Sequence, residues 1–240
     1  MRGIILSGGS GTRLKPLTTV TSKQLLPVYN KPMIYYPLNT LLKADIKEIL
    51  IIVAPERAGD YLNLLGSGRR FGARFTYEIQ DKPTGLPEAF IIGGNFIDKE
   101  NAVMILGDNI FEDDLSEDIK NFQSGAKIFV KKVADANRFA VVEVDENMKA
   151  ISIEEKPIHP KSDLCITGLY IYDNRVVEIA KKLKPSARAE TEIVDVHKWY
   201  MDKGELQIAE IKKEWIDAGT FESLLQAQIL AKEKLRNELK

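Results

Sequence analysis

Short apolar runs alternate with amphipathic stretches along the first half of the chain. The apolar runs predict buried strands at residues 2–7, 48–54, 73–80, 101–109 and 126–133. The segments between them have the spacing of apolar positions that predicts helices at residues 31–45, 55–68, 86–97 and 115–125. Strands that are apolar on both faces and separated by helices are typical of a mostly parallel sheet covered on both sides.

The pattern changes after residue 134. Residues 138–157 alternate between apolar and polar side chains around a bend at 145–147, which predicts an antiparallel hairpin. We further predict a strand over 163–174, a helix over 190–204, a strand over 205–211 and a helix over 221–240. The expected fold is therefore α/β, with a Rossmann-like, mostly parallel central sheet flanked by helices. We expect one domain over 1–240, made of a first part at about 1–134 and an antiparallel insertion at about 135–211.

Composition narrows the class of protein. The 34 basic and 35 acidic residues balance to a net charge of −1, so the basic excess of a nucleic-acid-binding protein is absent. The single cysteine, Cys165, excludes an internal disulfide and fits a cytoplasmic location. Two histidines and one cysteine disfavour a zinc site, so carboxylates would hold any metal. No apolar run approaches the roughly 20 residues of a membrane helix, so we expect no membrane partner.

A glycine-rich stretch, SGGSGTR (7–13), follows the first predicted strand. Glycines let backbone N–H groups approach an anion closely, because no Cβ stands in the way. The spacing matches neither the P-loop pattern nor the dinucleotide-binding pattern. An ordinary strand-to-helix turn is the alternative, but it leaves the nearby cations Arg13, Lys15 and Lys23 unexplained. We therefore expect a phosphate-binding loop.

Two consecutive segments, GGSGTRLKPLT (8–18) and SKQLLPVYNKPMIYY (22–36), resemble the sugar-1-phosphate nucleotidyltransferases. The resemblance extends along nearly the whole chain, because LGDN (106–109), IEEKP (153–157), TGLYIYD (167–173) and WIDAGT (215–220) follow in the family's order. The nearest branch implies transfer of a nucleotidyl group from dTTP to glucose-1-phosphate, giving dTDP-glucose and pyrophosphate. UTP or another sugar phosphate remains an alternative, as does a catalytically silent sugar-nucleotide-binding subunit.

The resemblance places the nucleotide in the first part of the chain. It implies that the backbone of Gly8, Gly9, Ser10, Gly11 and Thr12 wraps the nucleotide. The same resemblance implies phosphate contacts from Arg13 and Lys23, with Lys23 also reaching the sugar phosphate. The implied base-binding residues are Gln24, Gln80, Pro83 and Gly85. An amide carries both a donor and an acceptor, which suits the imide of thymine or uracil.

The resemblance also implies a Mg²⁺ ion, held by Asp108 after the fourth strand and by Asp217 near the C-terminal helix. Mg²⁺ prefers oxygen ligands and retains several waters, so two carboxylates fit it. Asp108 would also contact the nucleotide. The implied sugar site consists of Ala140, Glu155, Lys156, Thr167 and Gly168 from the insertion, together with Lys23 from the first part of the chain. The catalytic cations are then Arg13, Lys23 and Lys156, which neutralise and align two anions rather than form a covalent intermediate.

The sequence departs from the family pattern at three places, one of which is Ala218, where the last motif frequently has Thr. Phe139-Ala140 stands where the family has Tyr-Gly, which leaves the identity of the sugar open. Pro87-Glu88 stands where Ala-Gln is more frequent. The chain ends soon after one amphipathic helix, so we expect a short form without the regulatory site of longer members. The family further implies a homo-oligomer.

Overall fold

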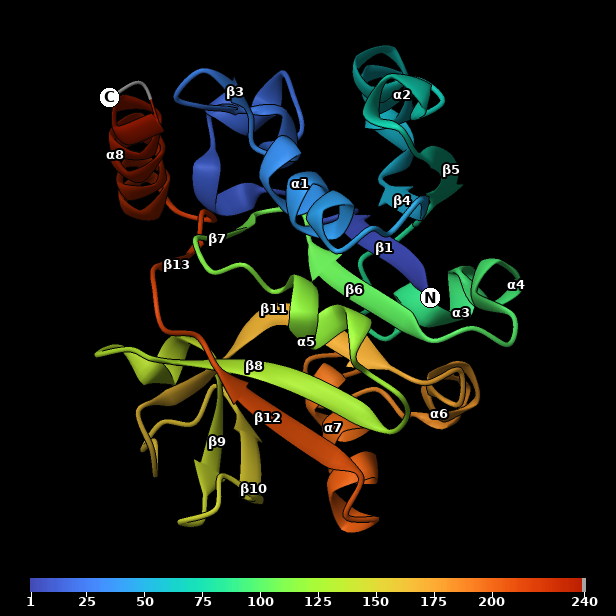
Figure 1. Cartoon of the computed structure of the whole chain (residues 1–240), viewed down its shortest axis with the longest axis vertical. Coiled ribbons are helices and arrows are strands. Elements are labelled where there is room, and N and C mark those ends of the chain that lie inside the picture. Colours follow the sequence, from blue (N-terminus) through green and yellow to red (C-terminus); the bar gives the residue numbers. More distant parts are fainter. Residues whose placement is uncertain (239–240) are drawn as a thin grey trace.

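The computed structural model describes residues 1–238 as a central sheet with helices packed on both faces (Figure 1). The strands are β1 (Arg2–Ser7), β2 (Pro27–Val28), β3 (Lys31–Pro32), β4 (Glu48–Val53), β5 (Arg74–Ile79), β6 (Ala102–Leu106), β7 (Asn109–Phe111), β8 (Ala126–Lys132), β9 (Ala140–Val144), β10 (Ala150–Glu155), β11 (Leu164–Tyr172), β12 (Leu206–Glu210) and β13 (Trp215–Asp217). The α-helices are α1 (Tyr35–Lys43), α2 (Ala58–Leu65), α3 (Glu88–Ile92), α4 (Gly94–Ile97), α5 (Ser116–Lys120), α6 (Val176–Lys182), α7 (Ile193–Asp202) and α8 (Phe221–Glu238).

The central sheet has nine strands and two halves. In the first half, β6, β1, β4 and β5 lie side by side and pair in parallel. The long strand β11 pairs antiparallel with β6 and begins the second half, where β8 and β9 also pair with it. The hairpin β9–β10 is antiparallel, as its alternating pattern predicts, and β12 pairs in parallel with β8. The predicted fold class is confirmed, while the proposed division of the domain stays a prediction.

Two apolar cores lie on opposite faces of the sheet. Helices α3, α4, α6 and α7 cover one face, over side chains such as Ile4 and Ile52. Helices α1, α2 and α5 cover the other face, over side chains such as Ile5 and Ile51. Alternate residues of β1 and β4 thus point to different cores, which explains why the middle of each strand is apolar on both faces. Within residues 1–238, no helix has both the length and the apolar character needed to cross a bilayer.

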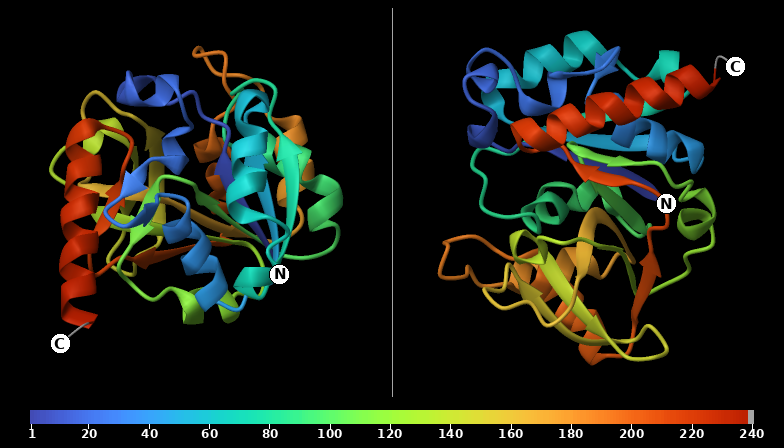
Figure 2. Two further views of the ribbon diagram at one scale, coloured as in Figure 1. Left: turned by 90° about the horizontal axis from the view of Figure 1, so that it is seen from above. Right: turned by 90° about the vertical axis from the view of Figure 1, so that its left-hand side faces the viewer.

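Helix α8 lies along the outside of the molecule, where Figure 2 shows it crossing the segment that holds β2 and β3. Its Leu224 and Ala227 pack against Leu14, Val28 and Met33 in a third core. This core anchors the segment after the glycine-rich stretch, because Leu14 is completely buried. The helix predicted over 221–240 is confirmed to Glu238, and residues 239–240 lie outside the described residues.

Several predicted boundaries are wrong for identifiable reasons. The helix predicted over 31–45 begins only at Tyr35, because Lys31–Pro32 forms a small hairpin with Pro27–Val28. The helix predicted over 86–97 divides at Gly93 into α3 and α4. The sequence predictions also lack α6, although its apolar side chains face one core.

Candidate active site

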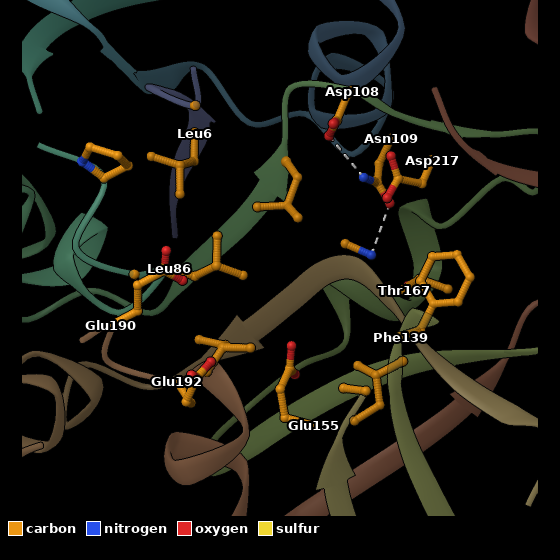
Figure 3. A pocket seen from close by; sticks show the side chains of 18 of the residues that line it. Leu6, Leu86, Asp108, Asn109, Phe139, Glu155, Thr167, Glu190, Glu192 and Asp217 are labelled. Atoms are coloured by element: carbon orange, nitrogen blue, oxygen red, sulfur yellow. Dashed lines mark hydrogen bonds between the residues drawn. The ribbon is translucent and has the colours of Figure 1, made fainter. Parts of the chain in front are cut away.

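A cavity of about 370 Å³ opens beyond the carboxyl ends of the parallel strands and continues over β9, β10 and β11 (Figure 3). One wall comes from the ends of β1, β5 and β6, and the opposite wall comes from the second half of the sheet. Open parallel sheets bind ligands at this edge. The predicted residues that line the cavity are Gly9, Arg13, Lys23, Gln24, Gln80, Pro83, Gly85, Asp108, Ala140, Glu155, Lys156, Thr167, Gly168 and Asp217.

The glycine-rich loop turns sharply between β1 and a short 3-10 helix. Gly11 has a left-handed backbone with φ of 63°, and its carbonyl oxygen accepts a hydrogen bond from Thr18 Oγ1 at 2.8 Å. Gly9 and Arg13 reach the cavity. The other predicted loop residues, Gly8, Ser10, Gly11 and Thr12, do not belong to the cavity lining. The loop thus presents one glycine and one guanidinium to the cavity.

Two carboxylates from distant segments of the chain come together at one side of the cavity (Figure 3). Asp108 follows β6, and the next strand, β7, pairs antiparallel with β13 so that Asn109 stands opposite Asp217. The backbone N–H of Ala218 donates to the carbonyl of Asp108 at 2.9 Å, which fixes the pairing. Lys23 Nζ forms an ion pair with Asp108 Oδ2. Figure 3 shows Asp108, Asn109 and Asp217 gathered on one side of the cavity.

The two carboxylates have pKa values that are shifted in opposite directions. Burial would raise the pKa of Asp108, but the charge and hydrogen bond of Lys23 outweigh it and lower that pKa. Burial lowers the pKa of Lys23, yet Asp108 raises it above its ordinary value overall. Burial and then the negative charge of Asp108 raise the pKa of Asp217 to about 6. Lys23 and Arg13 both lower the pKa of Asp217, but these two cations do not offset its burial and the charge of Asp108.

A magnesium ion fits this donor set. The described residues contain no group of three or more Asp, Glu, His or Cys side chains arranged to hold a metal. Mg²⁺ needs no such cage, because it accepts one or two carboxylates and fills its shell with water and phosphate oxygens. The pKa of Asp217 is raised by burial and by Asp108 even though Lys23 and Arg13 lower it, so a metal ion at this carboxylate would add positive charge that favours its ionised form.

Asn109 joins the carboxylate centre to β11. Its Oδ1 accepts hydrogen bonds from the Gly168 N–H at 2.9 Å and from Trp215 Nε1 at 2.7 Å. Its Nδ2 donates to Asp108 Oδ1 at 3.1 Å. A Cβ on Gly168 would lie 2.5 Å from Asn109 Oδ1, so only glycine fits there. The sequence predictions include Gly168 but neither Asn109 nor Trp215, whose roles depend on this distant contact.

The opposite wall combines acids with cations. Glu155 Oε1 forms an ion pair with Lys156 Nζ at 3.3 Å and accepts a hydrogen bond from Arg188 Nη2 at 3.2 Å. Arg188 also pairs with Glu192 Oε2 at 2.6 Å. Lys156 has a φ of 45°, a left-handed backbone that non-glycine residues adopt at some cost and that is frequent at functional sites. Arg188 is absent from the sequence predictions, and no local motif marks it.

Thr167 provides an unpaired hydroxyl on the same wall. Only 1% of the residue is exposed, and its Oγ1 has no hydrogen-bond partner among residues 1–238. A buried hydroxyl without a partner costs free energy, which a ligand that forms a hydrogen bond with it would recover.

Phe139 packs against the Trp215 ring at a centroid distance of 5.3 Å, so its ring contributes to packing as well as to the cavity wall.

The loop after β5 forms the far end of the cavity. Gly85 has a φ of 124°, and a Cβ there would overlap the carbonyl oxygen of Thr191. The backbone N–H of Thr191 donates to the carbonyl of Thr84 at 2.8 Å. This bridge ties the loop to the segment before α7, and Pro83 and Gly85 both line the cavity. Gln24 and Gln80 are 2% and 4% exposed, and both line the cavity.

A cavity at the carboxyl edge of a parallel sheet, with a glycine-rich loop, several cations and paired carboxylates, defines a nucleotide-binding transferase site. Residues 2–234 match the family model described as nucleotidyl transferase, and the chain belongs to this family. The resemblance seen in the sequence is thereby confirmed.

Two relatives with assigned names are about half identical to the chain in sequence. The chain is 52% identical over 233 residues to a glucose-1-phosphate thymidylyltransferase of Neisseria meningitidis, a match that covers 95% of this chain and 81% of the relative. It is 50% identical over 232 residues to the glucose-1-phosphate thymidylyltransferase of Mycobacterium tuberculosis, with the same two coverages.

Solved structures agree with the fold. A Bacillus anthracis chain assigned as a glucose-1-phosphate thymidylyltransferase, crystallised with sucrose, superposes with a TM-score of 0.91 at 46% identity. That match covers 96% of this chain and 95% of the other. A UDP-glucose pyrophosphorylase complexed with UDP-glucose shares the fold at 23% identity, with a TM-score of 0.85 and coverages of 97% and 98%.

Proposed function

We propose that the chain transfers a thymidylyl group from dTTP to glucose-1-phosphate, with Mg²⁺, and releases dTDP-glucose and pyrophosphate. The named relatives support this choice of substrates. The observation that carries the proposal is that Lys23, Asp108 and Asp217 line the same cavity as the predicted base-binding and sugar-binding residues, with Lys23 paired to Asp108. A reaction that joins two phosphates needs its charged groups in the cavity where the two substrates meet.

The nucleotide lies along the first half of the sheet. Its base occupies the end formed by Gln80 and Gly85, and its triphosphate follows the loop toward Arg13. The guanidinium of Arg13 stays charged and can bind paired phosphate oxygens, so it stabilises the departing pyrophosphate. Lys23 supplies a second positive charge close to the α-phosphate.

The sugar phosphate lies against the second half of the sheet. The free hydroxyl of Thr167 and the carboxylate of Glu155 bind sugar hydroxyls, while Lys156 and Arg188 face the phosphate. The phosphate oxygen is already an anion and attacks the α-phosphorus directly. The P–O bond to pyrophosphate breaks as the new P–O bond forms, so the chain supplies alignment and charge neutralisation.

Asp108 and Asp217 are the residues that would hold Mg²⁺. When bound, the metal ion supplies positive charge that offsets the repulsion between the phosphates. Asn109 keeps Asp108 oriented, and Lys23 balances its charge before the substrates arrive.

The test is pyrophosphate release with Mg²⁺, crossing dTTP, UTP, CTP, ATP and GTP against glucose-, galactose-, mannose- and glucosamine-1-phosphate. We expect the highest rate with dTTP and glucose-1-phosphate, and almost none when a chelator replaces Mg²⁺. A maximum with another pair would contradict the assigned substrates but keep the reaction class. No release with any pair would favour the silent binding subunit.

A further inference from the structure

The segment after the glycine-rich loop, residues 15–20, is joined to the rest of the molecule by few hydrogen bonds. All of its residues except Thr18 are exposed, and Val20 is 77% exposed. In the described part of the chain, every hydrogen bond that joins this segment to a residue outside 11–20 comes from the side chain of Arg57. One arginine thus supplies all of these attachments.

Arg57 binds two consecutive carbonyl groups of the segment. Its Nη1 donates to the carbonyl of Val20 at 3.0 Å, and its Nη2 donates to the carbonyl of Thr19 at 2.9 Å. The guanidinium is planar and presents its N–H groups in a fixed fork, so the two bonds together fix both the position and the orientation of the segment. Arg57 ends the 3-10 turn Pro55–Arg57 that follows β4, and it immediately precedes α2. The two bonds therefore tie the segment to the carboxyl edge of the sheet.

The segment held by Arg57 packs on the glycine-rich loop. Thr18 Oγ1 donates to the carbonyl of Gly11 at 2.8 Å. An added Cβ on Gly11 would lie 2.9 Å from Thr18 Cγ2 and 3.4 Å from the Cβ of Lys23, so the three residues are in close contact. Gly11 immediately precedes the 3-10 turn that carries Arg13, and Arg13 lines the cavity. A displacement of Thr18 would therefore move the backbone that carries Arg13.

We propose that Arg57 is a positioning residue for the phosphate-binding loop and acts through Thr18 to hold the Arg13 guanidinium at the cavity. Arg57 does not line the cavity itself, so it acts through this chain of contacts. Because Arg13 binds the outer phosphates, the loss of Arg57 weakens binding of a triphosphate and spares a nucleotide that has only its α-phosphate. The inference rests on the proposed function for the identity of the ligand as dTTP.

The Arg57→Met variant tests the inference, because it keeps an apolar stem and removes both donors. We expect the dissociation constant of dTTP, measured by calorimetry, to rise about tenfold, the equivalent of one to two hydrogen bonds. The dissociation constant of dTMP should stay within twofold, so the ratio of the dTTP constant to the dTMP constant rises about tenfold. Arg57→Lys keeps the charge but lacks the fork, so its ratio should lie between those of Arg57→Met and the unmodified chain.

Thr18→Val removes only the hydroxyl that reaches Gly11, so it should raise the same ratio. If both residues act through one chain of contacts, the double variant of Arg57→Met and Thr18→Val should raise the ratio by less than the product of the two single changes. Arg74→Met is the matched control, because it removes the same charge from a side chain that is 77% exposed and that pairs with Glu48 at 4.0 Å. It should leave the ratio unchanged.

A ratio for Arg57→Met within twofold of the unmodified chain overturns the inference, as does an equal loss of affinity for dTTP and dTMP. Pyrophosphate release is measured separately, so that the two proposals can be distinguished. A chain that shows the expected change of ratio but releases no pyrophosphate contradicts the proposed function and leaves the inference intact. A chain that releases pyrophosphate and whose ratio does not change overturns the inference alone.

Discussion

The Gly168→Ala substitution tests the link between Asn109 and the carboxylate centre. The added methyl would lie 2.5 Å from Asn109 Cγ and Oδ1 and 2.7 Å from Nδ2. Asn109 is 2% exposed and is held by three hydrogen bonds, so it cannot move away without breaking some of them. The clash involves a side chain rather than a strained backbone.

Overpacking of a core costs about 1–3 kcal/mol, and each lost hydrogen bond adds about 1 kcal/mol. We therefore expect the free energy of unfolding to fall by about 3 kcal/mol or slightly more. For a chain of this size, that loss lowers Tm by roughly 6–12 °C. Because Asp108 also loses the partner that orients it, kcat should fall about tenfold.

The assays are thermal unfolding and pyrophosphate release. Gly59→Ala is the control, since nothing lies within 4 Å of a Cβ there and alanine favours a helix. Combining Gly168→Ala with Asn109→Ala removes the clash, so the double variant should be less destabilised than the sum of the single variants. A Gly168→Ala variant with unchanged Tm and kcat would show that neither the fold nor the carboxylate centre depends on this close approach to Asn109.

Three further predictions concern the charged groups of the site. Lys23→Met leaves Asp108 without its ion-pair partner. It should lower the free energy of unfolding by up to about 3 kcal/mol at pH 8 and by less at pH 5. Equal losses at the two pH values in denaturant titrations would contradict this. Arg13→Ala should lower kcat for pyrophosphate release far more than it weakens glucose-1-phosphate binding; a change in binding alone would exclude its role on the triphosphate. Because the pKa of Asp217 is raised to about 6, the folded chain keeps a proton there that the unfolded chain loses at lower pH. The stability contributed by this group should thus fall as the pH rises through 6, and Mg²⁺ binding should weaken as the pH falls through 6. Calorimetry from pH 5 to 8 checks both trends, and Asp217→Asn should abolish them.

Local patterns predicted most of the strands and helices. Strands such as β1 and β4 are apolar on both faces, and the hairpin β9–β10 has an alternating pattern, so each has a local signal. The start of α1 has no comparable signal, because Pro32 suits a first helical turn as well as a small hairpin. The sheet pairing of Lys31–Pro32 with Pro27–Val28 decides between them.

The site was predicted where motifs mark it and missed where distant contacts create it. The segments around Arg13, Asp108 and Lys156 carry the family motifs. Arg188 belongs to no such motif, and only the fold brings it to Glu155. The strands β7 and β13 have three residues each, too few for a pattern, yet their pairing places Asp217 beside the Asp108 segment.

We propose that one cavity holds both substrates around the Asp108–Asp217 pair. Formation of dTDP-glucose from dTTP and glucose-1-phosphate in a Mg²⁺ titration, compared between the unmodified chain and Asp108→Asn, measures this. We expect Mg²⁺-dependent product from the unmodified chain and almost none from the variant at any Mg²⁺ concentration, with the variant still folded. Equal product from both chains, or product that does not depend on Mg²⁺, would contradict it.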